Sequence, residues 1–569
     1  MALFGFGRKN KQPDVSGILG APAVGREKKP NAEGYYKVRC PYCLEEFEPW
    51  EMEFRAAVDT FGTRATETRS KSSARDRMRD DENSPFGGSR GRWNQPAEEE
   101  RAPTENAKGT QGNYFAVEPD EKLRQFYENV HKLGGAAVMG KVLSLSNTEG
   151  DISKVKFHNA KEPIPFEQAQ RFLQERKVPV DCVWDKFGHM TDNRVCPHCH
   201  NKMADRAGIL PSYVICFFGN TSCGKTVYKI RLLHELYASH ALLPGRPVTV
   251  GTYYTGNTID GQDTQNLGML YDMTFGEATK SPGQPIVKAT DVEYIEPITL
   301  TLARGGREMA LVTFFDFPGE AIWGDQEQHQ WFVDRMKEVL MYIDGIIFLL
   351  DPSTLDTLRR YLPEEFCPQT RRDGADVQTI AKREAKPTTV LQEFTNNYLS
   401  GGGQLDVPMA IVYSKADLFR ELIERYRDGE ITDERVAEMM CELMAKPRFL
   451  TNWIEPDRPG KSRREHTSVD IGNILEAERE LKRFVIDPVL EDMLDSQFKR
   501  GVLFAASAVG APVEFDGEGA NVPEAAGIRI TEPLEYLLWM FGLVEHAPIN
   551  DSEKMFAARL KDPNVLGGR

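Results

Sequence analysis

The residues Gly219 to Thr226, GNTSCGKT, have the spacing G-x-x-x-x-G-K-T of a phosphate-binding loop. They follow an apolar run rich in β-branched and aromatic residues (212–218) and open a segment with helical apolar spacing (225–240). A strand, a glycine-bounded turn and a helix N-terminus therefore meet there, and their N–H groups favour phosphate oxygens. The predicted phosphate ligands are Gly219, Asn220, Thr221, Ser222, Cys223, Gly224, Lys225 and Thr226. The alternative is an ordinary strand-to-helix turn with a surface lysine.

Three residues of this loop have more specific expected roles. We expect Lys225 to reach the terminal phosphates and to serve catalysis there, and the Thr226 hydroxyl to ligate Mg²⁺. Cys223 lies at a helix N-terminus, a position that can lower the pKa of a thiol. We favour the simpler interpretation of Cys223 as a small packing residue.

A second pair of candidates ends a predicted antiparallel hairpin, formed by residues 294–303 and 308–317. The sequence DFPG places Asp316 three residues before Gly319. A carboxylate at the end of a neighbouring strand can hold the hydration shell of Mg²⁺. A glycine three residues later can offer its N–H to the terminal phosphate, because no Cβ stands in the way. We therefore predict that Asp316 serves Mg²⁺ and that Gly319 binds phosphate.

A third group of candidates follows two later predicted strands. The sequence SKAD ends in Asp417, and a carboxylate is an acceptor-only group that can take both the N1–H and the N2–H₂ donors of guanine. Adenine offers no such pair of donors. Lys415 can lay its aliphatic stem over the ring, and the sequence ASA can supply a backbone N–H to the guanine O6. The predicted guanine-binding residues are Ser414, Lys415, Asp417, Ser507 and Ala508.

Two Cys-x-x-Cys pairs indicate a metal site. The pairs are Cys40 with Cys43 and Cys196 with Cys199, and each follows a predicted strand. Four thiolates in two such knuckles are the ligand pattern of a zinc ribbon with a closed tetrahedral site. The alternative is a redox dithiol, which normally begins a helix on a βαβ frame, and the residues after these pairs make poor first helical turns. His198 and His200 can in principle replace a cysteine ligand, but neighbouring knuckle residues more often support the site.

With these motifs in this order, residues 206–545 resemble the TRAFAC-type P-loop GTPases, which include translation-factor-related and Ras-like proteins. The combination of this domain with an N-terminal zinc ribbon resembles the bacterial double-GTPase families. The resemblance implies an α/β P-loop GTPase fold, a three-layer sandwich with a mostly parallel sheet, beside a small zinc-ribbon and α+β region. It also implies GTP, Mg²⁺ and structural Zn²⁺ as cofactors. Such families are thought to act as regulatory GTPases in multi-gene systems, including biological-conflict systems.

The chain departs from the resemblance at several positions. Thr221 stands where Ras-like GTPases have glycine, Glu320 stands where they carry the water-positioning glutamine, and Ser414 replaces the usual Asn or Thr. The resemblance also implies a switch threonine, for which Thr290 is our first choice and Thr279 the second. We therefore expect Lys225, Glu320 and Thr290 to be the catalytic residues of a slowly hydrolysing enzyme.

Composition limits the remaining classes. The chain has 569 residues, 40% hydrophobic residues and a net charge of −15, which makes a globally basic nucleic-acid binder unfavourable. No apolar run reaches the length of a membrane span, and the N-terminal apolar stretch is too brief for a signal peptide, so we expect a cytoplasmic protein. Nine cysteines in so long a chain favour reduced thiols with a metal site over a disulfide scaffold.

Changes of composition along the chain predict its organisation. The segment 60–113 is rich in Arg, Ser, Glu, Gly and Pro and has too few apolar residues to fold. The predicted parts are a disordered tail (1–34), a zinc ribbon split between 35–50 and 190–205, a disordered linker (60–113), a small inserted α+β segment (114–189), the GTPase domain (206–545) and a second tail (546–569).

Three functions remain open at this point. The first is a GTP-hydrolysing switch with protein effectors or regulators. The second is an ATPase, with Glu320 as its only candidate base, and the third is a nucleotide-locked scaffold with little turnover. Nucleic acid is a less favoured partner of the ribbon, because the sequence CLEEFEPWE after the first knuckle is acidic.

Overall fold

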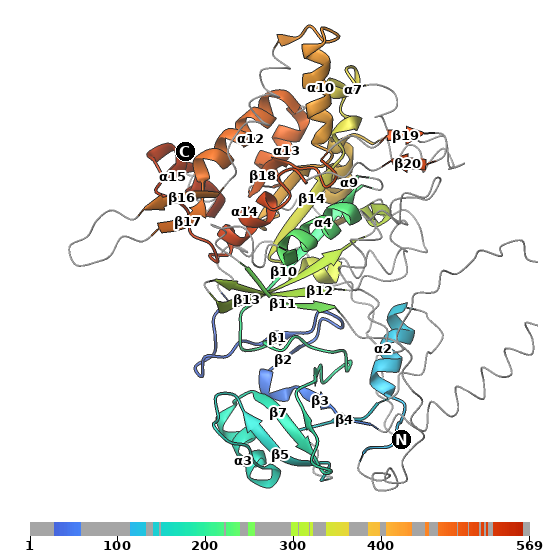
Figure 1. The fold of residues 1–569 in the computed structure, drawn as a ribbon, viewed down its shortest axis with the longest axis vertical. Coiled ribbons are helices and arrows are strands. Elements are labelled where there is room, and N and C mark those ends of the chain that lie inside the picture. Colours follow the sequence, from blue (N-terminus) through green and yellow to red (C-terminus); the bar gives the residue numbers. More distant parts are fainter. Residues whose placement is uncertain are drawn as a thin grey trace, which may run out of the picture. The chain divides into compact units, whose positions relative to one another are not determined.

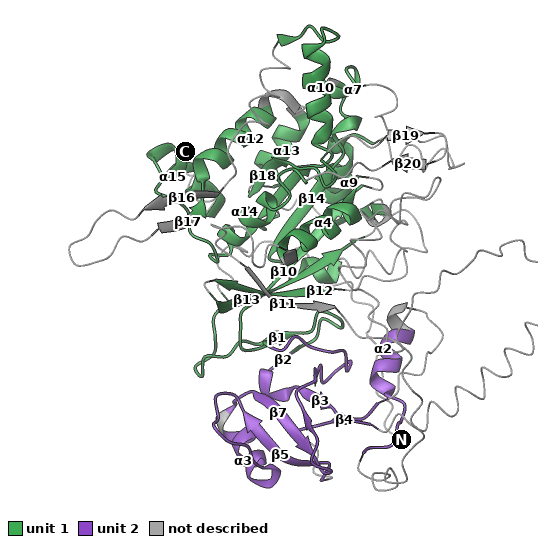
Figure 2. Ribbon diagram, viewed as in Figure 1, with its two compact units in different colours: residues 1–46, 206–569 green, residues 47–205 purple. Residues whose placement is uncertain are grey.

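The structure is a computed structural model of the 569-residue chain. It describes residues 28–58, 114–131, 140–146, 150–220, 223–238, 249–255, 297–304, 306–317, 319–322, 337–362, 385–398, 405–434, 450–454, 465–485, 488–498, 500–510, 514–516, 519–521 and 527–561. The chain divides into two compact units, Met1–Glu46 with Arg206–Arg569 and Phe47–Asp205 (Figure 2). Each unit has its own sheets and its own apolar core.

The first unit is built on a seven-stranded mixed sheet with the order β11-β12-β13-β10-β14-β15-β18 (Figure 1). Its strands are β11 (Thr249–Thr255), β12 (Ile298–Arg304), β13 (Arg307–Asp316), β10 (Ser212–Gly219), β14 (Gly345–Leu350), β15 (Met409–Tyr413) and β18 (Gly501–Ala505). The strands from β13 to β18 pair in parallel, whereas β12 pairs antiparallel with both β11 and β13. The predicted hairpin and the mostly parallel sheet are therefore confirmed.

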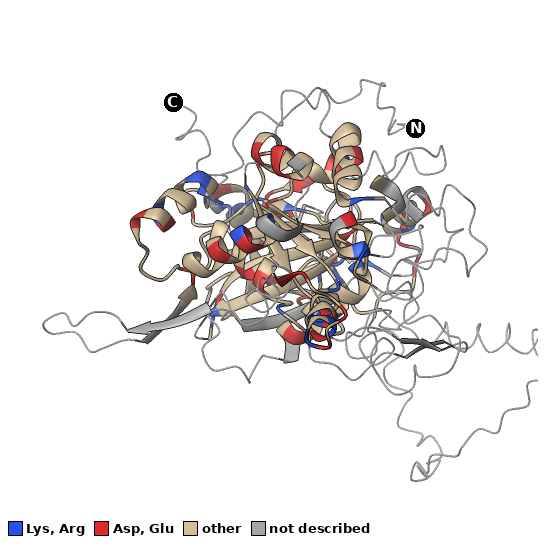
Figure 3. Ribbon diagram, turned by 90° about the horizontal axis from the view of Figure 1, so that it is seen from above, with Lys and Arg blue, Asp and Glu red and all other residues tan. Residues whose placement is uncertain are grey.

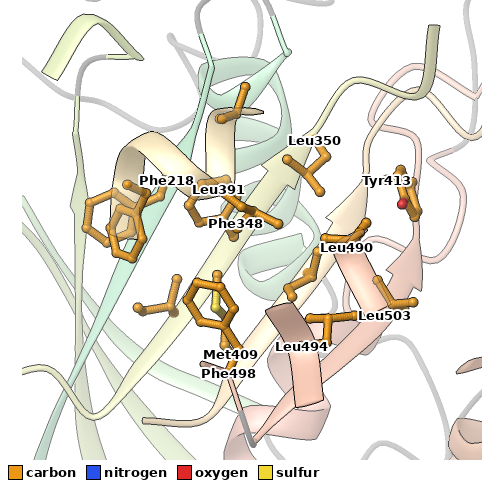
Figure 4. Packing of buried hydrophobic residues seen from close by; sticks show 14 of the residues in the cluster. Phe218, Phe348, Leu350, Leu391, Met409, Tyr413, Leu490, Leu494, Phe498 and Leu503 are labelled. Carbon is orange, nitrogen blue, oxygen red and sulfur yellow. The ribbon is translucent and has the colours of Figure 1, made fainter. Parts of the chain in front are cut away.

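Both faces of this sheet are buried, as near-continuous apolar strands require. Alternate residues of β10 serve opposite cores: Phe218 lies in one cluster and Phe217 in the other. On the first face Phe218 packs against Phe348, with ring centroids 6.2 Å apart, and against Phe394, at 5.0 Å. Figure 4 shows Phe218 and Phe348 beside Leu391 in this core. The arrangement makes three layers, with helices over each face of the sheet.

The helices of the first unit divide between the two faces. Those that place side chains in the Phe218 core include α9 (Pro387–Tyr398), α10 (Asp417–Arg427) and α13 (Pro488–Ser496). Those in the Phe217 core include α4 (Lys225–Ala238), α12 (Ile471–Val485), α14 (Glu532–Met540) and α15 (Asp551–Lys561). Viewed from above, the ribbon positions of charged residues lie mostly on the helices, and the strands between them are mostly uncharged (Figure 3).

Short elements complete the first unit. They are β1 (Val38–Arg39), β2 (Glu46–Phe47), η6 (Gly319–Ile322), η8 (Pro352–Thr354), α7 (Asp356–Arg359), β16 (Leu450–Ile454), β17 (Glu465–Val469), β19 (Glu514–Asp516) and β20 (Gly519–Asn521), with β2 crossing into the second unit. The pairs β1-β2, β16-β17 and β19-β20 each form a separate two-stranded sheet. None of these pairs extends the seven-stranded sheet that carries the predicted site.

The second unit contains two small antiparallel sheets. Their orders are β4-β3-β9 and β6-β5-β7-β8. The elements are η2 (Pro49–Glu51), β3 (Glu53–Arg55), α2 (Glu121–His131), β4 (Val142–Leu143), β5 (Ile152–Phe157), β6 (Ile164–Pro165), α3 (Phe166–Arg176), β7 (Val180–Asp185), β8 (Met190–Thr191) and β9 (Arg194–Val195). Helix α3 buries Phe166 and Ala169 with Val155 and Val183 of the strands, so this helix and these strands share a small α+β core.

Two parts expected to be tails are folded where the structure describes them. Within 28–34, Lys28 pairs with Asp344 at 2.8 Å, and Asn31 Oδ1 accepts the Tyr35 N–H at 2.8 Å. The region 546–569 includes helix α15, which buries Phe556 and Leu560. The sequence of this helix, DSEKMFAARLK, is mostly polar, and its apolar face has only a few residues, so the helix was not predicted from the sequence. The predicted linker 60–113 and residues 1–27 lie outside the described part.

Candidate functional site

The predicted ligands follow strands that end at the same edge of the seven-stranded sheet. Parallel register pairs Phe217 with Asp316 on one side of β10 and Gly219 with Leu349 on the other. It then pairs Leu350 with Tyr413, directly before Ser414. Strands are spaced about 4.8 Å apart, so the three steps from β13 to β15 span roughly 14 Å. That length matches an extended nucleoside triphosphate, with phosphates at one end and the base at the other.

The turn after β10 requires glycine at its first position. Gly219 has φ = 146°, and a Cβ there would lie 2.4 Å from the Leu349 carbonyl oxygen and 2.8 Å from Cys223 Sγ. Gly224, directly before α4, also has a positive φ of 85°, but a Cβ there would meet no atom within 4 Å. The two positions therefore require glycine for different physical reasons. At Gly219 the reason is the close approach of β14, and at Gly224 it is the backbone conformation alone.

Substitution of Gly219 by Ala is expected to destabilise the protein by about 3 kcal/mol, because the new methyl group meets a backbone carbonyl and the backbone conformation is strained. Gly224→Ala is the matched control, with an expected loss of about 1 kcal/mol from conformation alone. Denaturant unfolding of both variants measures the difference. Equal losses for the two would contradict the account of the turn.

Lys225, the first residue of α4, is buried and folds over the loop. Its Nζ donates to the carbonyl oxygens of Gly219, at 3.0 Å, and Asn220, at 3.2 Å. An ammonium group has three donors, so the two bonds to described residues leave one for an anion. Asn220 and Cys223 are also buried, whereas Thr226 is half-buried on the first turn of the helix. Burial raises the pKa of the Cys223 thiol, which supports packing and not the lowered pKa that its helix position alone suggests.

Asp316 is buried at the end of β13, with 4% of the residue exposed. Its Oδ2 accepts a hydrogen bond from Lys229 of α4, with 2.7 Å between Nζ and Oδ2. Its Oδ1 is buried and has no hydrogen-bond partner among the described residues. A buried carboxylate oxygen without a partner is costly, and hard oxygen ligands suit Mg²⁺, so Asp316 and Thr226 fit the predicted cation.

The segment predicted to read the base, Ser414 to Asp417, contains Lys415, which has a positive φ of 57°. Its Nζ donates to Asp351 Oδ2, and the Oδ1 of Asp351 accepts from the Ser353 N–H at 2.9 Å and from its hydroxyl at 2.6 Å. Burial by itself lowers the pKa of Lys415, but the charge of Asp351 and this hydrogen bond outweigh it and raise the pKa. Asp351 thus fixes the end of the Lys415 side chain, whose aliphatic stem is expected to cover the base.

The structure brings together Asp417 and Ser507, two residues predicted to bind guanine, through a hydrogen bond. Asp417 is 5% exposed, and burial raises its pKa, while a hydrogen bond with Ser507 lowers it. The two segments are also joined through the backbone, because the Ala416 N–H donates to the Ala506 carbonyl at 3.1 Å. Ser414 is buried, and its hydroxyl donates to the Leu350 carbonyl at 3.0 Å, so it ties β15 to β14.

One expected donor is already occupied. The Ser507 N–H donates to the Ile528 carbonyl at 2.9 Å, and the Ser507 hydroxyl accepts from the Gly510 N–H at 2.8 Å. The backbone N–H of Ser507 therefore does not serve the guanine O6 in this structure, and Ala508 is left as the predicted donor. The isolated bridge between Ser507 and Ile528 joins segments 21 residues apart, which the local sequence did not reveal.

Several predicted residues cannot be placed. Thr221, Ser222, Thr279 and Thr290 lie outside the described residues, and so does the side chain of Glu320. Gly319 is described as a buried residue that opens the short helix η6. Two contacts at the site were missed by sequence reasoning, those of Asp351 and Lys229. Asp351 directly follows a buried strand, which is a usable signal, whereas nothing in the sequence around Lys229 points to Asp316.

The four predicted zinc ligands lie together. One ligand atom from each of Cys40, Cys43, Cys196 and Cys199 lies within 4.8 Å of the others. The donor set of four sulfurs is that of a structural zinc site, and three of the cysteines are buried. The site therefore fits Zn²⁺.

The two knuckles repeat the same local geometry. The N–H two residues after the first cysteine of each pair donates to its Sγ at 3.4 Å, from Tyr42 to Cys40 and from His198 to Cys196. The residue after each second cysteine, Leu44 or His200, has a positive φ. Its N–H returns to the carbonyl of the first cysteine at 2.9 Å in both knuckles. Such N–H to sulfur bonds stabilise thiolate charge, which supports metal binding over redox chemistry.

The two knuckle histidines have other contacts. His200 Nδ1 lies 2.7 Å from Asp120 Oδ1, and its Nε2 lies 2.8 Å from Glu53 Oε2. The ring of His198 contacts that of Phe47 edge to face, with centroids 5.9 Å apart. Because both nitrogens of His200 are engaged by carboxylates, His200 supports the second knuckle and does not replace a cysteine.

Comparison with known proteins adds little to this geometry. No protein-family model matches the chain, and no curated protein matches it. Among solved structures, the chain is similar to one of the chloroplast translocon components atToc33 and psToc159, for whose GTPase activity dimerization is important. That match covers 58% of this chain and 84% of the other, with 11% identity and a TM-score of 0.23, and a likeness this weak carries no argument. Within the described residues, no helix has both the length and the apolar composition needed to cross a bilayer.

Proposed function

We propose that this protein binds GTP with Mg²⁺ and hydrolyses it slowly as a regulatory switch. The observation that carries the proposal is the strand register that brings the Gly219 turn, Asp316 and Asp417 to one edge of the sheet. Phosphate-binding loops and base-reading loops both require that edge, because ligands of open α/β sheets bind beyond the carboxyl ends of the strands.

Different residues of the site bind different parts of the nucleotide. Lys225 and the N–H groups at the start of α4 bind the phosphates. Asp417 accepts the two guanine donors, and its bond with Ser507 orients the carboxylate for that contact. Lys415, held by Asp351, covers the ring with its stem. Mg²⁺, when bound beside Thr226 and Asp316, neutralises charge on the phosphates.

The finer parts of the proposal rest on the sequence. Glu320 replaces the water-positioning glutamine of Ras-like GTPases, and Thr221 replaces a glycine with a bulkier residue that excludes an arginine finger, so slow turnover is part of the proposal. The four-cysteine site holds structural Zn²⁺. The resemblance to double-GTPase families suggests protein effectors and a role in a bacterial multi-gene system, including one of the conflict type.

Phosphate release from GTP and from ATP under single-turnover conditions tests the proposed activity. GTP is expected to be cleaved and ATP to be cleaved far more slowly. Lys225→Ala is expected to reduce GTP cleavage by about 100-fold or more, because an ammonium on a transferring phosphoryl group stabilises transition-state charge. Lys554→Ala on the exposed face of α15 is the control. Cleavage of ATP at the GTP rate would replace this proposal with the ATPase.

A further inference from the structure

The Lys229 side chain places a fixed positive charge at the carboxylate expected to face Mg²⁺. Lys229 lies one helical turn after Lys225 and Thr226 on α4. Its Nζ donates to Asp316 Oδ2 at 2.7 Å, and the side chains of Lys229 and Asp316 are 17% and 5% exposed. This ion pair is therefore shielded from water. Charges interact more strongly in such a buried position than on the surface.

The two oxygens of Asp316 differ in their surroundings. Oδ2 is neutralised by Lys229, while Oδ1 is buried without a partner among the described residues. Among the described residues, Oδ1 is thus the oxygen that can meet the cation, or water in its shell, without sharing a bond already made. Mg²⁺ bound to the same carboxylate would lie close to the Lys229 ammonium. The two positive charges repel each other at that short range.

We propose that Lys229 is a positioning residue that fixes Asp316 and weakens Mg²⁺ binding at the nucleotide site. The inference rests on the proposed function. With this ion pair, the nucleotide affinity of the site depends less on Mg²⁺ than it would if Asp316 were unpaired. Lys229 supplies in advance part of the positive charge that Mg²⁺ otherwise brings to Asp316.

The test is calorimetric titration with GDP across a series of Mg²⁺ concentrations, for the wild type and two matched variants. Lys229→Gln keeps an N–H donor for Oδ2 and removes the charge, whereas Lys229→Arg keeps the charge. Lys229→Gln is expected to reach its half-maximal gain in GDP affinity at about tenfold lower Mg²⁺, because one repelling charge is lost. Lys229→Arg is expected to behave as the wild type.

Each outcome decides between the two proposals. An unchanged or higher Mg²⁺ requirement in Lys229→Gln overturns the inference and leaves the proposed function standing. No GDP binding by the folded wild type at any Mg²⁺ concentration overturns both. Thermal unfolding shows whether Lys229→Gln is folded. If it is not, Lys229→Met, which fills similar space without a donor, replaces it.

Discussion

Asp417→Asn is expected to lower the affinity for GTP by about 100-fold or more and to favour xanthosine triphosphate instead. The amide keeps one oxygen acceptor but turns a donor toward the 2-amino group of guanine, which is also a donor. Xanthine carries a carbonyl oxygen at that position and accepts the new donor. Because Asp417 is buried beside Ser507, the carboxamide keeps the same place and the exchange tests its chemistry alone. Calorimetry with both nucleotides measures the change.

A matched control lies on the same helix. Asp428 is exposed at the end of α10, so Asp428→Asn changes the net charge equally and is expected to leave both affinities unaltered. A variant Asp417→Asn that binds GTP as tightly as the wild type would show that this carboxylate does not read the base.

Loss of one zinc ligand is the second large expected effect. Cys196→Ser is expected to abolish stoichiometric zinc and to lower the free energy of unfolding by several kcal/mol, since structural zinc contributes on the order of 10 kcal/mol in zinc-finger peptides. Zinc content by a colorimetric chelator and thermal unfolding with and without that chelator measure both effects. The wild type with its zinc removed should resemble the variant.

Cys182 provides the control for the zinc prediction. It is a buried cysteine of β7 outside the four-sulfur cluster, and burial raises its pKa. Cys182→Ser is expected to keep its zinc and to lose only about 1 kcal/mol, the cost of burying a hydroxyl in place of a thiol. Equal zinc loss in both variants would contradict the assignment of the four ligands.

Features encoded over short distances in the chain were predictable. The turn at Gly219 stands between an apolar strand and a helix, and the hairpin that ends at Asp316 has a clear glycine turn. Both are present at the expected residues. The two cysteine pairs were predicted to share a site because zinc needs four ligands, and their sulfurs do lie together. In each case the residue types and their spacing carried the physical requirement.

Features that depend on distant partners were not predictable. Strand β11 (Thr249–Thr255) was missed although TVGTYYT is β-branched and aromatic, because its glycine and polar surroundings resemble a loop. The Ser507 N–H was assigned to guanine because its bond to Ile528 is formed only in the fold. The contacts of Lys229 with Asp316 and of Lys415 with Asp351 depend on strand and helix packing. A single sequence does not encode these distances in any local pattern.

The most direct test of the central claim is calorimetric titration of the wild-type chain with GTP and with ATP, both with Mg²⁺. The account predicts a preference for GTP of roughly 100-fold or more, since adenine lacks the donor pair that a buried Asp417 requires. Asp417→Ala should remove that preference. Equal affinity for the two nucleotides, unchanged in Asp417→Ala, would contradict a guanine site and leave the strand edge to a different ligand.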